Sequence, residues 1–73
     1  MDQPVILCGL GKVGWTVLDF LKTAGLSVVA IDLHVKPTDS RLAGVRFIQG
    51  DCRQKEVLEE AGLAKARGIF GHG

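Results

Sequence analysis

Short apolar segments alternate along the chain with segments of helical periodicity. A continuous apolar run at residues 5–8 and a mainly apolar, β-branched run at residues 26–31 predict strands. Runs without polar alternation are typical of parallel strands that are buried on both faces. The run at 45–49 alternates more, so this third strand is expected nearer an edge of the sheet. Residues 67–70 predict the start of a fourth strand.

Between these runs the apolar residues recur at the spacing of a helix. The first helix is expected to begin at Lys12 and to stop at Gly25. Residues 36–43 have room for only a turn or two of helix. A third helix is predicted to open at Asp51, with Gln54 three residues on as a variant of the capping box. The apolar stripe of the first helix consists of Val13, Val17, Leu18 and Leu21.

The resulting order is β-α-β-α-β-α-β, with connections long enough for right-handed parallel crossovers. This order predicts an α/β fold, a Rossmann-like parallel sheet with strand order 3-2-1-4. Only the N-terminal half of such a fold is present, because the fifth and sixth strands are missing. We therefore expect residues 1–73 to form a single truncated domain.

Composition and charge narrow the class of protein. Of the 73 residues, 47% are hydrophobic, and nine Lys and Arg balance eight Asp and Glu, so the net charge is +1. This balance gives no electrostatic reason to expect a nucleic-acid partner. No uncharged stretch approaches the roughly 20 residues that span a bilayer, and the N-terminus lacks the pattern of a secretory signal. We expect a cytoplasmic domain without direct membrane insertion.

Size and cysteine content bear on stability. A domain of roughly 60 residues buries only about 60% of its unfolded surface, so it is marginal without further support. Cys8 and Cys52 form no zinc-binding motif. The predicted strand order separates them by two strand spacings, about 9.6 Å, too far for a disulfide. We expect two reduced thiols, no metal site, and stability gained by self-association, as a homo-oligomer or a strand-exchanged form.

The most informative motif is a glycine-rich hexapeptide between the first strand and the first helix. It matches G-x-G-x-x-G in the context of a dinucleotide-binding turn. Gly9 would permit the tight turn, Gly11 the approach of a pyrophosphate, and Gly14 close packing of helix and strand. A turn with no ligand is the alternative interpretation. The full hexapeptide consists of Gly9, Leu10, Gly11, Lys12, Val13 and Gly14.

Asp32 ends the second strand, eighteen residues after Gly14. A carboxylate here can accept two hydroxyl hydrogen bonds from an adenosine ribose, which favours NAD or an unmodified adenine nucleotide over NADP. The alternative interpretation is a solvated acid at a strand end. Because Asp32 is at a strand end, its replacement is expected to leave folding largely intact. Lys12 could meet a phosphate or could simply be a lysine at a helix start.

Further candidates surround this position. Leu33 and His34 follow Asp32 and are candidates to line the ribose or adenine pocket, although we favour an exposed loop for His34. Asp51 is favoured as the N-cap of the third helix and could also accept from an adenine amine. Trp15 is favoured as a packing residue over a nucleotide contact. No catalytic set can be placed on converging strand ends, so no catalytic residue is predicted.

Four segments together resemble the RCK (or KTN) nucleotide-binding domain of potassium channels and Trk/Ktr-type uptake systems. The resemblance covers roughly residues 4–70 and is more specific than the glycines alone. It implies Gly9, Gly11 and Gly14 at the phosphates, Asp32 at the ribose, and Asp51 with its neighbour Cys52 near the adenine. The family often has Arg where this chain has Lys12. The four segments are residues 8–14, 28–32, 44–52 and 57–66.

The resemblance implies a non-catalytic regulatory domain that binds NAD(H), ADP or ATP. It would serve a membrane potassium channel or transporter subunit, whose gate responds because the nucleotide binds one conformation better than another. Two alternatives stay open. One is the cofactor-binding half of an NAD-dependent oxidoreductase or epimerase. The other is a structural remnant that binds nothing.

Overall fold

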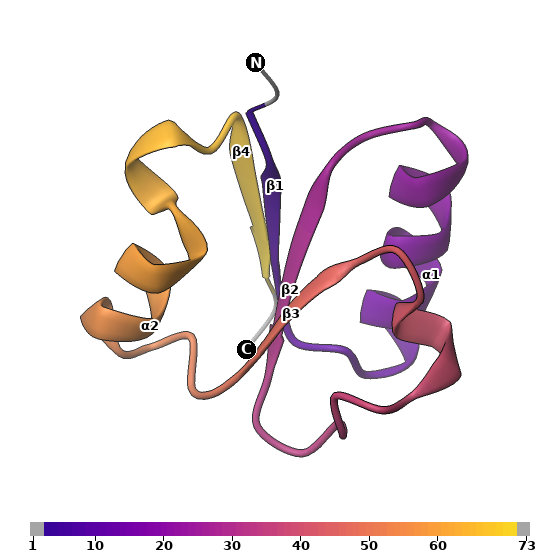
Figure 1. Ribbon diagram of the computed structural model, residues 1–73, viewed down its shortest axis with the longest axis horizontal. Helices are drawn as coiled ribbons and strands as arrows, with labels where there is room; N and C mark the ends of the chain where they lie inside the picture. The colour runs from indigo at the N-terminus through magenta and orange to yellow at the C-terminus, as the bar shows by residue number, and fades with distance from the viewer. Residues whose placement is uncertain (1–2, 72–73) are drawn as a thin grey trace.

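The computed structural model describes residues 3–71, which form a four-stranded parallel sheet in the order β3-β2-β1-β4 (Figure 1). The predicted Rossmann-like half-fold and strand order are confirmed. The elements are β1 (Val5–Cys8), α1 (Lys12–Thr23), β2 (Val28–Asp32), the 3-10 turn η1 (Ser40–Leu42), β3 (Arg46–Gln49), α2 (Lys55–Ala61), the 3-10 turn η2 (Leu63–Lys65) and β4 (Gly68–Gly71).

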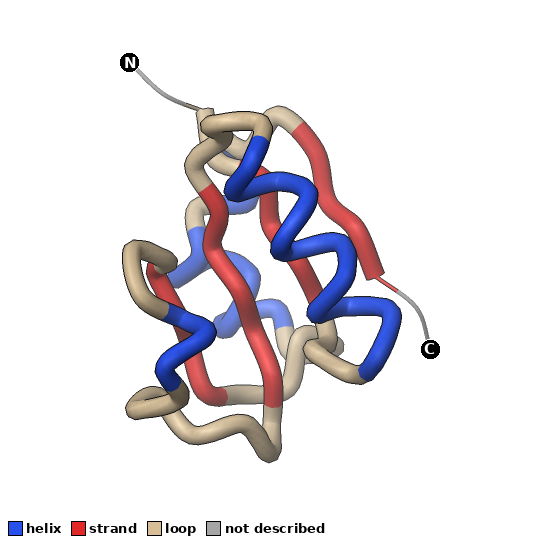
Figure 2. The backbone as a smooth tube through the Cα atoms, turned by 90° about the vertical axis from the view of Figure 1, so that its right-hand side faces the viewer, coloured by secondary structure: helices blue, strands red, loops and turns tan. Residues whose placement is uncertain are grey.

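Helices cover both faces of the sheet, with α1 on one side and α2 on the other (Figures 1 and 2). All four residues of β1 are buried, as the uninterrupted apolar run predicts. Because side chains alternate along a strand, Val5 and Leu7 join the core beneath α1, whereas Ile6 and Cys8 join the core beneath α2. The central strand therefore contributes to two separate apolar cores.

The buried stripe of α1 is displaced by one position from the expected one. Gly14, Leu18 and Leu21 are buried, but the Val13 side chain is 60% exposed. Gly14 is the point where α1 contacts the end of β1, so the buried stripe starts at a residue without a side chain. A search for large apolar residues alone cannot find that start, and the placement of Val13 in the stripe was wrong.

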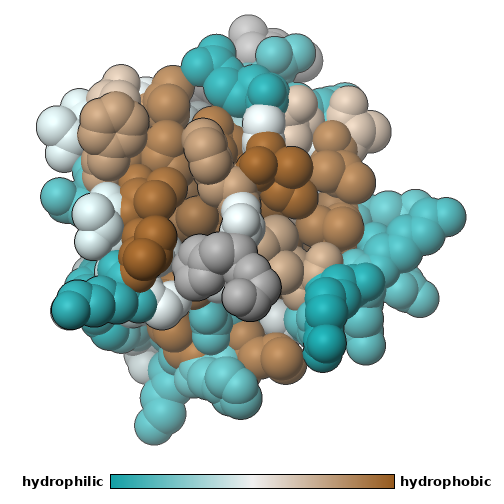
Figure 3. All heavy atoms as spheres, turned by 180° about the vertical axis from the view of Figure 1, so that it is seen from behind, coloured by the Kyte–Doolittle hydropathy of each residue, from teal (hydrophilic) through white to brown (hydrophobic). Residues whose placement is uncertain are grey.

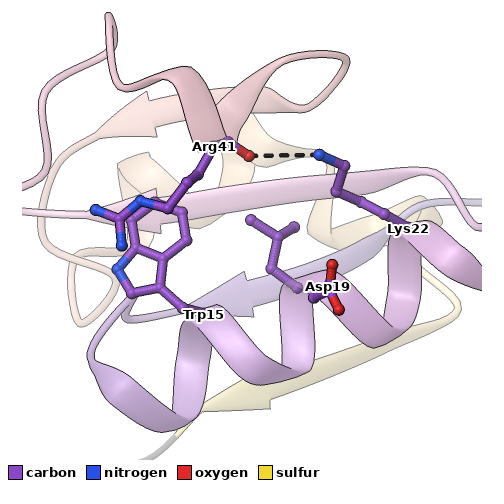
Figure 4. Close-up of a pocket in the computed structure, with 5 residues that line it drawn as sticks. Trp15, Asp19, Lys22 and Arg41 are labelled. Carbon is purple, nitrogen blue, oxygen red and sulfur yellow. Dashed lines mark hydrogen bonds between the residues drawn. The ribbon is translucent and has the colours of Figure 1, made fainter.

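A small hollow of about 170 Å³ lies between α1 and η1 (Figure 4). The Arg41 guanidinium lies 3.7 Å from the centroid of the Trp15 ring, a cation–π contact, and Lys22 donates to the Arg41 carbonyl oxygen at 3.4 Å. Trp15 thus packs against a neighbouring element, as favoured from the sequence. The expected helix at 36–43 is one 3-10 turn, capped by the Asp39 carboxylate, which accepts from the Arg41 N–H.

The start of α2 corrects a prediction. This helix begins at Lys55, and its N-cap is Gln54, not Asp51. The Asp51 carboxylate accepts instead from the backbone N–H of Arg53 at 2.8 Å, while the Gln54 N–H donates to the Asp51 carbonyl oxygen. Aspartate side chains favour such local turns, which compete with helix initiation. The turn delays the helix by several residues and fixes the loop that follows β3.

Candidate functional site

The carboxyl ends of β1, β2 and β3 meet at one edge of the sheet, where the structure forms a cleft of about 430 Å³. Six predicted site residues line it, together with two residues that the sequence did not single out. In parallel α/β sheets, ligands bind in this position. The lining residues are Gly9, Ile31, Asp32, Leu33, His34, Gly50, Asp51 and Cys52.

The unpredicted residues follow from the same geometry. Ile31 precedes Asp32 in β2, and Gly50 is the first residue after β3. A Cβ at Gly50 would lie 3.1 Å from a methyl of Val57, so a larger residue would crowd α2. Their position at strand ends was a signal that could have identified them. The other five hexapeptide residues form the turn and the first turn of α1, beside the cleft.

The glycine-rich turn has two positions where glycine is required by the fold. Gly9 has a φ of 91°, a conformation that L-residues rarely adopt, and its N–H donates to the Ile31 carbonyl oxygen at 2.8 Å. A Cβ at Gly14 would overlap the Gly9 carbonyl oxygen and would lie 3.0 Å from its carbon. The turn and the close packing of helix on strand therefore account for the first and third glycines without a ligand.

Gly11 is different, because its φ of −73° is accessible to any residue. It is the N-cap of α1 and provides no side-chain cap. The first hydrogen bond of the helix runs from the Trp15 N–H to the Gly11 carbonyl oxygen at 2.9 Å. The N–H groups of the first helical turn, before Trp15, therefore have no acceptor within the helix, and they carry the positive end of its dipole. Lys12 and Val13 are exposed on this turn.

Asp32 ties the glycine-rich turn to the end of β2. Its carboxylate accepts from the Leu10 N–H at 2.7 Å, the His34 N–H at 2.8 Å and the Val35 N–H at 3.0 Å. Burial acts to raise the pKa of Asp32, but the three backbone donors outweigh it and hold the pKa below its ordinary value. A substitution here removes structural bonds, so the expectation that folding would be left intact needs correction.

The lowered pKa predicts that part of the stability depends on an ionised Asp32. Since the folded-state pKa lies below the ordinary value of 3.8, this stability is present above about pH 4 and is lost as the pH falls through 3.8 and then through the folded pKa. We expect the Tm of the wild type to fall more steeply below pH 4 than that of Asp32→Asn. Thermal melts from pH 6 to pH 2, followed by circular dichroism, measure this. Parallel pH profiles for the two proteins would contradict it.

Asp51 is held by its neighbour rather than by a helix. The Arg53 guanidinium donates to both carboxylate oxygens, with Nη2 to Oδ2 at 2.8 Å and Nε to Oδ1 at 3.1 Å. Hydrogen bonding from Arg53 lowers the pKa of Asp51 to about 2. The fork-to-fork geometry makes the loop at 51–53 a defined wall of the cleft.

The loop after Asp32 supplies the opposite wall. Leu33 is 49% exposed and His34 is exposed, as favoured for His34. The Gln49 side-chain amide donates to the Leu33 carbonyl oxygen at 3.4 Å, which links this loop to the end of β3. An exposed leucine beside an ionised carboxylate presents an apolar surface next to a hydrogen-bond acceptor.

The two cysteines lie closer together than predicted. Both are free thiols, as expected, but Cys8 is buried in the core beneath α2 and Cys52 packs against that same core. Burial, followed by hydrogen bonding and charge repulsion from Cys52, raises the pKa of Cys8 to about 12. The expected separation of two strand spacings was wrong because Cys52 lies beyond β3, in the loop that crosses back over the sheet toward α2.

A parallel βαβ sheet with a glycine turn, an acid at the end of β2 and a cleft at the carboxyl edge defines a Rossmann-like nucleotide-binding half-domain. The family described as the TrkA-N domain matches residues 5–71. The chain belongs to this family, and the resemblance to the Trk-type RCK/KTN domain is confirmed.

Relatives of known sequence and structure agree with this assignment. A protein named as the K⁺ efflux antiporter KefB of Alkalimonas amylolytica is 32% identical over 68 residues, 92% of this chain but 10% of that protein. The Kef C-terminal domain of Shewanella denitrificans in its AMP-bound form has a TM-score of 0.79 at 27% identity. The alignment covers 92% of this chain and 39% of that domain's chain.

A crystal structure of a UDP-glucose 4-epimerase is also similar. Its TM-score is 0.76 at 25% identity, with 94% of this chain and 22% of the epimerase chain covered. The chain thus spans less than half of each of these proteins. Within residues 3–71 no helix has the length and apolarity needed to cross a membrane. No three metal-ligating side chains gather into a metal site in the same described range.

Proposed function

We propose that this chain is a non-catalytic regulatory domain that binds NAD(H) or an adenine nucleotide and acts within a potassium transport system. The single observation that carries the proposal is the position of Asp32. Its carboxylate joins the glycine-rich turn to the cleft wall, so a ligand there would contact the turn, the acid and both loops together.

Each part of a nucleotide has a matching part of the site. The phosphates would meet the backbone at Gly11 and the free N–H groups at the start of α1, which favour negative charge. The ribose would meet Asp32, whose carboxylate has about four acceptor positions and uses three on the backbone. The adenine would lie between Leu33–His34 and Asp51–Cys52, and Lys12 would act as a mobile charge near the terminal phosphates.

The regulatory role rests on the relatives. KefB is named as a potassium antiporter, and the Kef C-terminal domain was solved with AMP bound. A domain of this kind would lie on the cytoplasmic side of a membrane transporter subunit. A nucleotide could then bias transport only through a difference in affinity between two conformations of the assembly.

The second candidate is the cofactor-binding half of an NAD-dependent epimerase or oxidoreductase. The similarity to UDP-glucose 4-epimerase favours it, because that enzyme shares the same half-fold. A catalytic group would then have to come from sequence outside this chain. The two candidates differ in what a bound nucleotide changes, namely ion flux in one case and turnover of a substrate in the other.

The direct test is a titration of the protein with NADH, NADPH and AMP, followed by NMR shifts of the cleft backbone amides. We expect NADH and AMP, but not NADPH, to move the amides of Gly11, Lys12 and Gly50. Potassium flux from vesicles that hold the full-length transporter, with and without the nucleotide, then tests regulation. No shift with any of the three nucleotides would refute nucleotide binding, and unchanged flux despite binding would refute regulation.

The exposed apolar surface supports a proposal of self-association. Figure 3 shows hydrophobic side chains gathered over much of one face of the molecule. On the edge strand β4, Ile69 and Phe70 are each 50% exposed, and Phe20 on α1 is 69% exposed. Such an edge offers both an unpaired strand and apolar contacts to a second chain. We therefore propose a homo-oligomer, with strand exchange at β4 as one form.

This proposal predicts that the mean mass rises with concentration in sedimentation experiments. Phe70→Lys should shift the equilibrium toward monomer by about tenfold or more, since a charge on an edge strand opposes pairing. Lys65→Ala, at the exposed 3-10 turn before β4, is the matched control and should change little. A wild type that stays monomeric at every concentration would contradict the prediction.

A further inference from the structure

Two thiols lie beside each other in the core beneath the cleft, and their mutual contact has no part in the nucleotide contacts proposed above. Cys8 is the last residue of β1 and is only 7% exposed, directly before Gly9 of the glycine-rich turn. Cys52 lies in the loop after β3, lines the cleft and packs against the core that contains Cys8. The sequence separates the two residues widely, so only the fold brings them together.

We propose that Cys52 and Cys8 form an oxidation site, in which Cys52 reacts with a hydroperoxide from the cleft and Cys8 then closes a disulfide with it. The two residues differ in exposure. Cys52 is partly exposed to the cleft, where a small peroxide can reach it. Cys8 is shielded, and its raised pKa keeps it a thiol that does not itself react with the peroxide.

The chemistry balances in two steps. The Cys52 thiolate attacks one peroxide oxygen, the O–O bond breaks, and a sulfenic acid forms with release of water or an alcohol after protonation. The Cys8 sulfur then attacks the Cys52 sulfur, its S–H proton passes to the leaving hydroxyl, and a second water departs. Two thiol sulfurs are oxidised to one disulfide, and one peroxide is reduced.

The disulfide would tie one wall of the cleft, the loop that contains Cys52, to the central strand β1. It would link the buried end of β1, directly before Gly9, to the loop that contains Gly50 and Asp51. The bond would hold this loop beside the place proposed for the adenine. This consequence rests on the proposed nucleotide binding, but the formation of the disulfide does not.

The experiment treats the reduced protein with hydrogen peroxide, traps remaining thiols with a maleimide under denaturing conditions, and measures masses. We expect an intramolecular disulfide, reversed by dithiothreitol, that forms at least about tenfold faster in the native protein than in urea, because folding places the sulfurs together. Cys52→Ser should leave Cys8 unmodified. Cys8→Ala should retain a sulfenic acid on Cys52, which dimedone traps.

Several results would overturn the proposal. They are two free thiols after peroxide, disulfides only between chains, or a rate that denaturant does not lower. A separate measurement tests the link to the cleft, since AMP or NADH should slow alkylation of native Cys52 and the disulfide should weaken their binding about tenfold or more. Disulfide formation without nucleotide protection would refute the proposed nucleotide site while the oxidation site stands.

Discussion

Asp32→Ala is expected to lose both nucleotide affinity and stability. Removal of the carboxylate takes away the charge-assisted bond that its remaining acceptor position would make to the ribose, worth roughly 1.5–3 kcal/mol, or about one to two orders of magnitude in affinity for NAD. It also leaves the N–H groups of Leu10, His34 and Val35 without their acceptor. We expect a loss of about 2–4 kcal/mol in the free energy of unfolding, because the Leu10 bond is partly buried.

The preference for NAD over NADP separates the binding role of Asp32 from its structural role. A 2′-phosphate would replace a hydroxyl donor with a charge that faces the carboxylate, so the wild type should reject NADP. Asp32→Asn keeps an acceptor for the backbone and removes the charge. It should therefore retain more stability than Asp32→Ala and still narrow the gap between the two cofactors.

The measurement is a set of dissociation constants for NAD and NADP, by calorimetry, beside urea unfolding of each variant. Binding must be compared under conditions in which every variant is folded, since Asp32→Ala is expected to have a lower midpoint of urea unfolding. Equal affinities for NAD and NADP in the wild type, unchanged by either substitution, would show that Asp32 does not bind the ribose. Unchanged unfolding midpoints would show that its three backbone bonds contribute little.

Much of the fold was predictable because it depends on local patterns. β1 is apolar throughout and β2 is apolar up to its last residue, Asp32, which indicates strands covered on both faces, and the glycine turn between β1 and α1 implies a parallel crossover. Gly14 illustrates the limit of this approach. Its lack of a side chain makes it the contact point of α1, so the pattern of large apolar residues wrongly predicts Val13 on the buried face.

The candidate site was predictable as a set of residues but not as a set of contacts. The positions of Gly9, Asp32 and Asp51 at strand ends follow from the topology. The bidentate partner of Asp51 is Arg53, only two residues away, and sequence could not rank this local turn above a helix cap. The proximity of Cys52 to Cys8 depends on the path of a loop that no periodicity describes.

Replacement of Gly14 by Ala is expected to have the largest effect on stability of any single methyl added to the chain. The new Cβ would overlap the Gly9 carbonyl oxygen, which belongs to the backbone and cannot move aside as a flexible side chain does. Relief requires α1 to shift away from β1. We expect a loss of about 3 kcal/mol, which lowers the Tm of a domain of this size by about 12–24 °C.

Two other glycines provide matched comparisons for Gly14→Ala. Gly68→Ala adds the same methyl on β4, where no heavy atom lies within 4 Å, so it should be neutral or slightly stabilising. Gly11→Ala has an accessible φ and should cost little stability, yet its methyl would stand where the phosphates approach the backbone. It should weaken nucleotide binding by about tenfold or more.

Thermal melts and nucleotide titrations of the three variants decide between two explanations of the hexapeptide. If Gly14→Ala unfolds the protein while Gly11→Ala removes binding from a stable fold, then the third glycine serves packing and the second serves the ligand. Equal loss of fold and binding in both variants would mean that the glycines serve the turn alone. A Gly14→Ala variant as stable as Gly68→Ala would instead show that α1 tolerates a wider separation from β1 than the overlap at Gly9 implies.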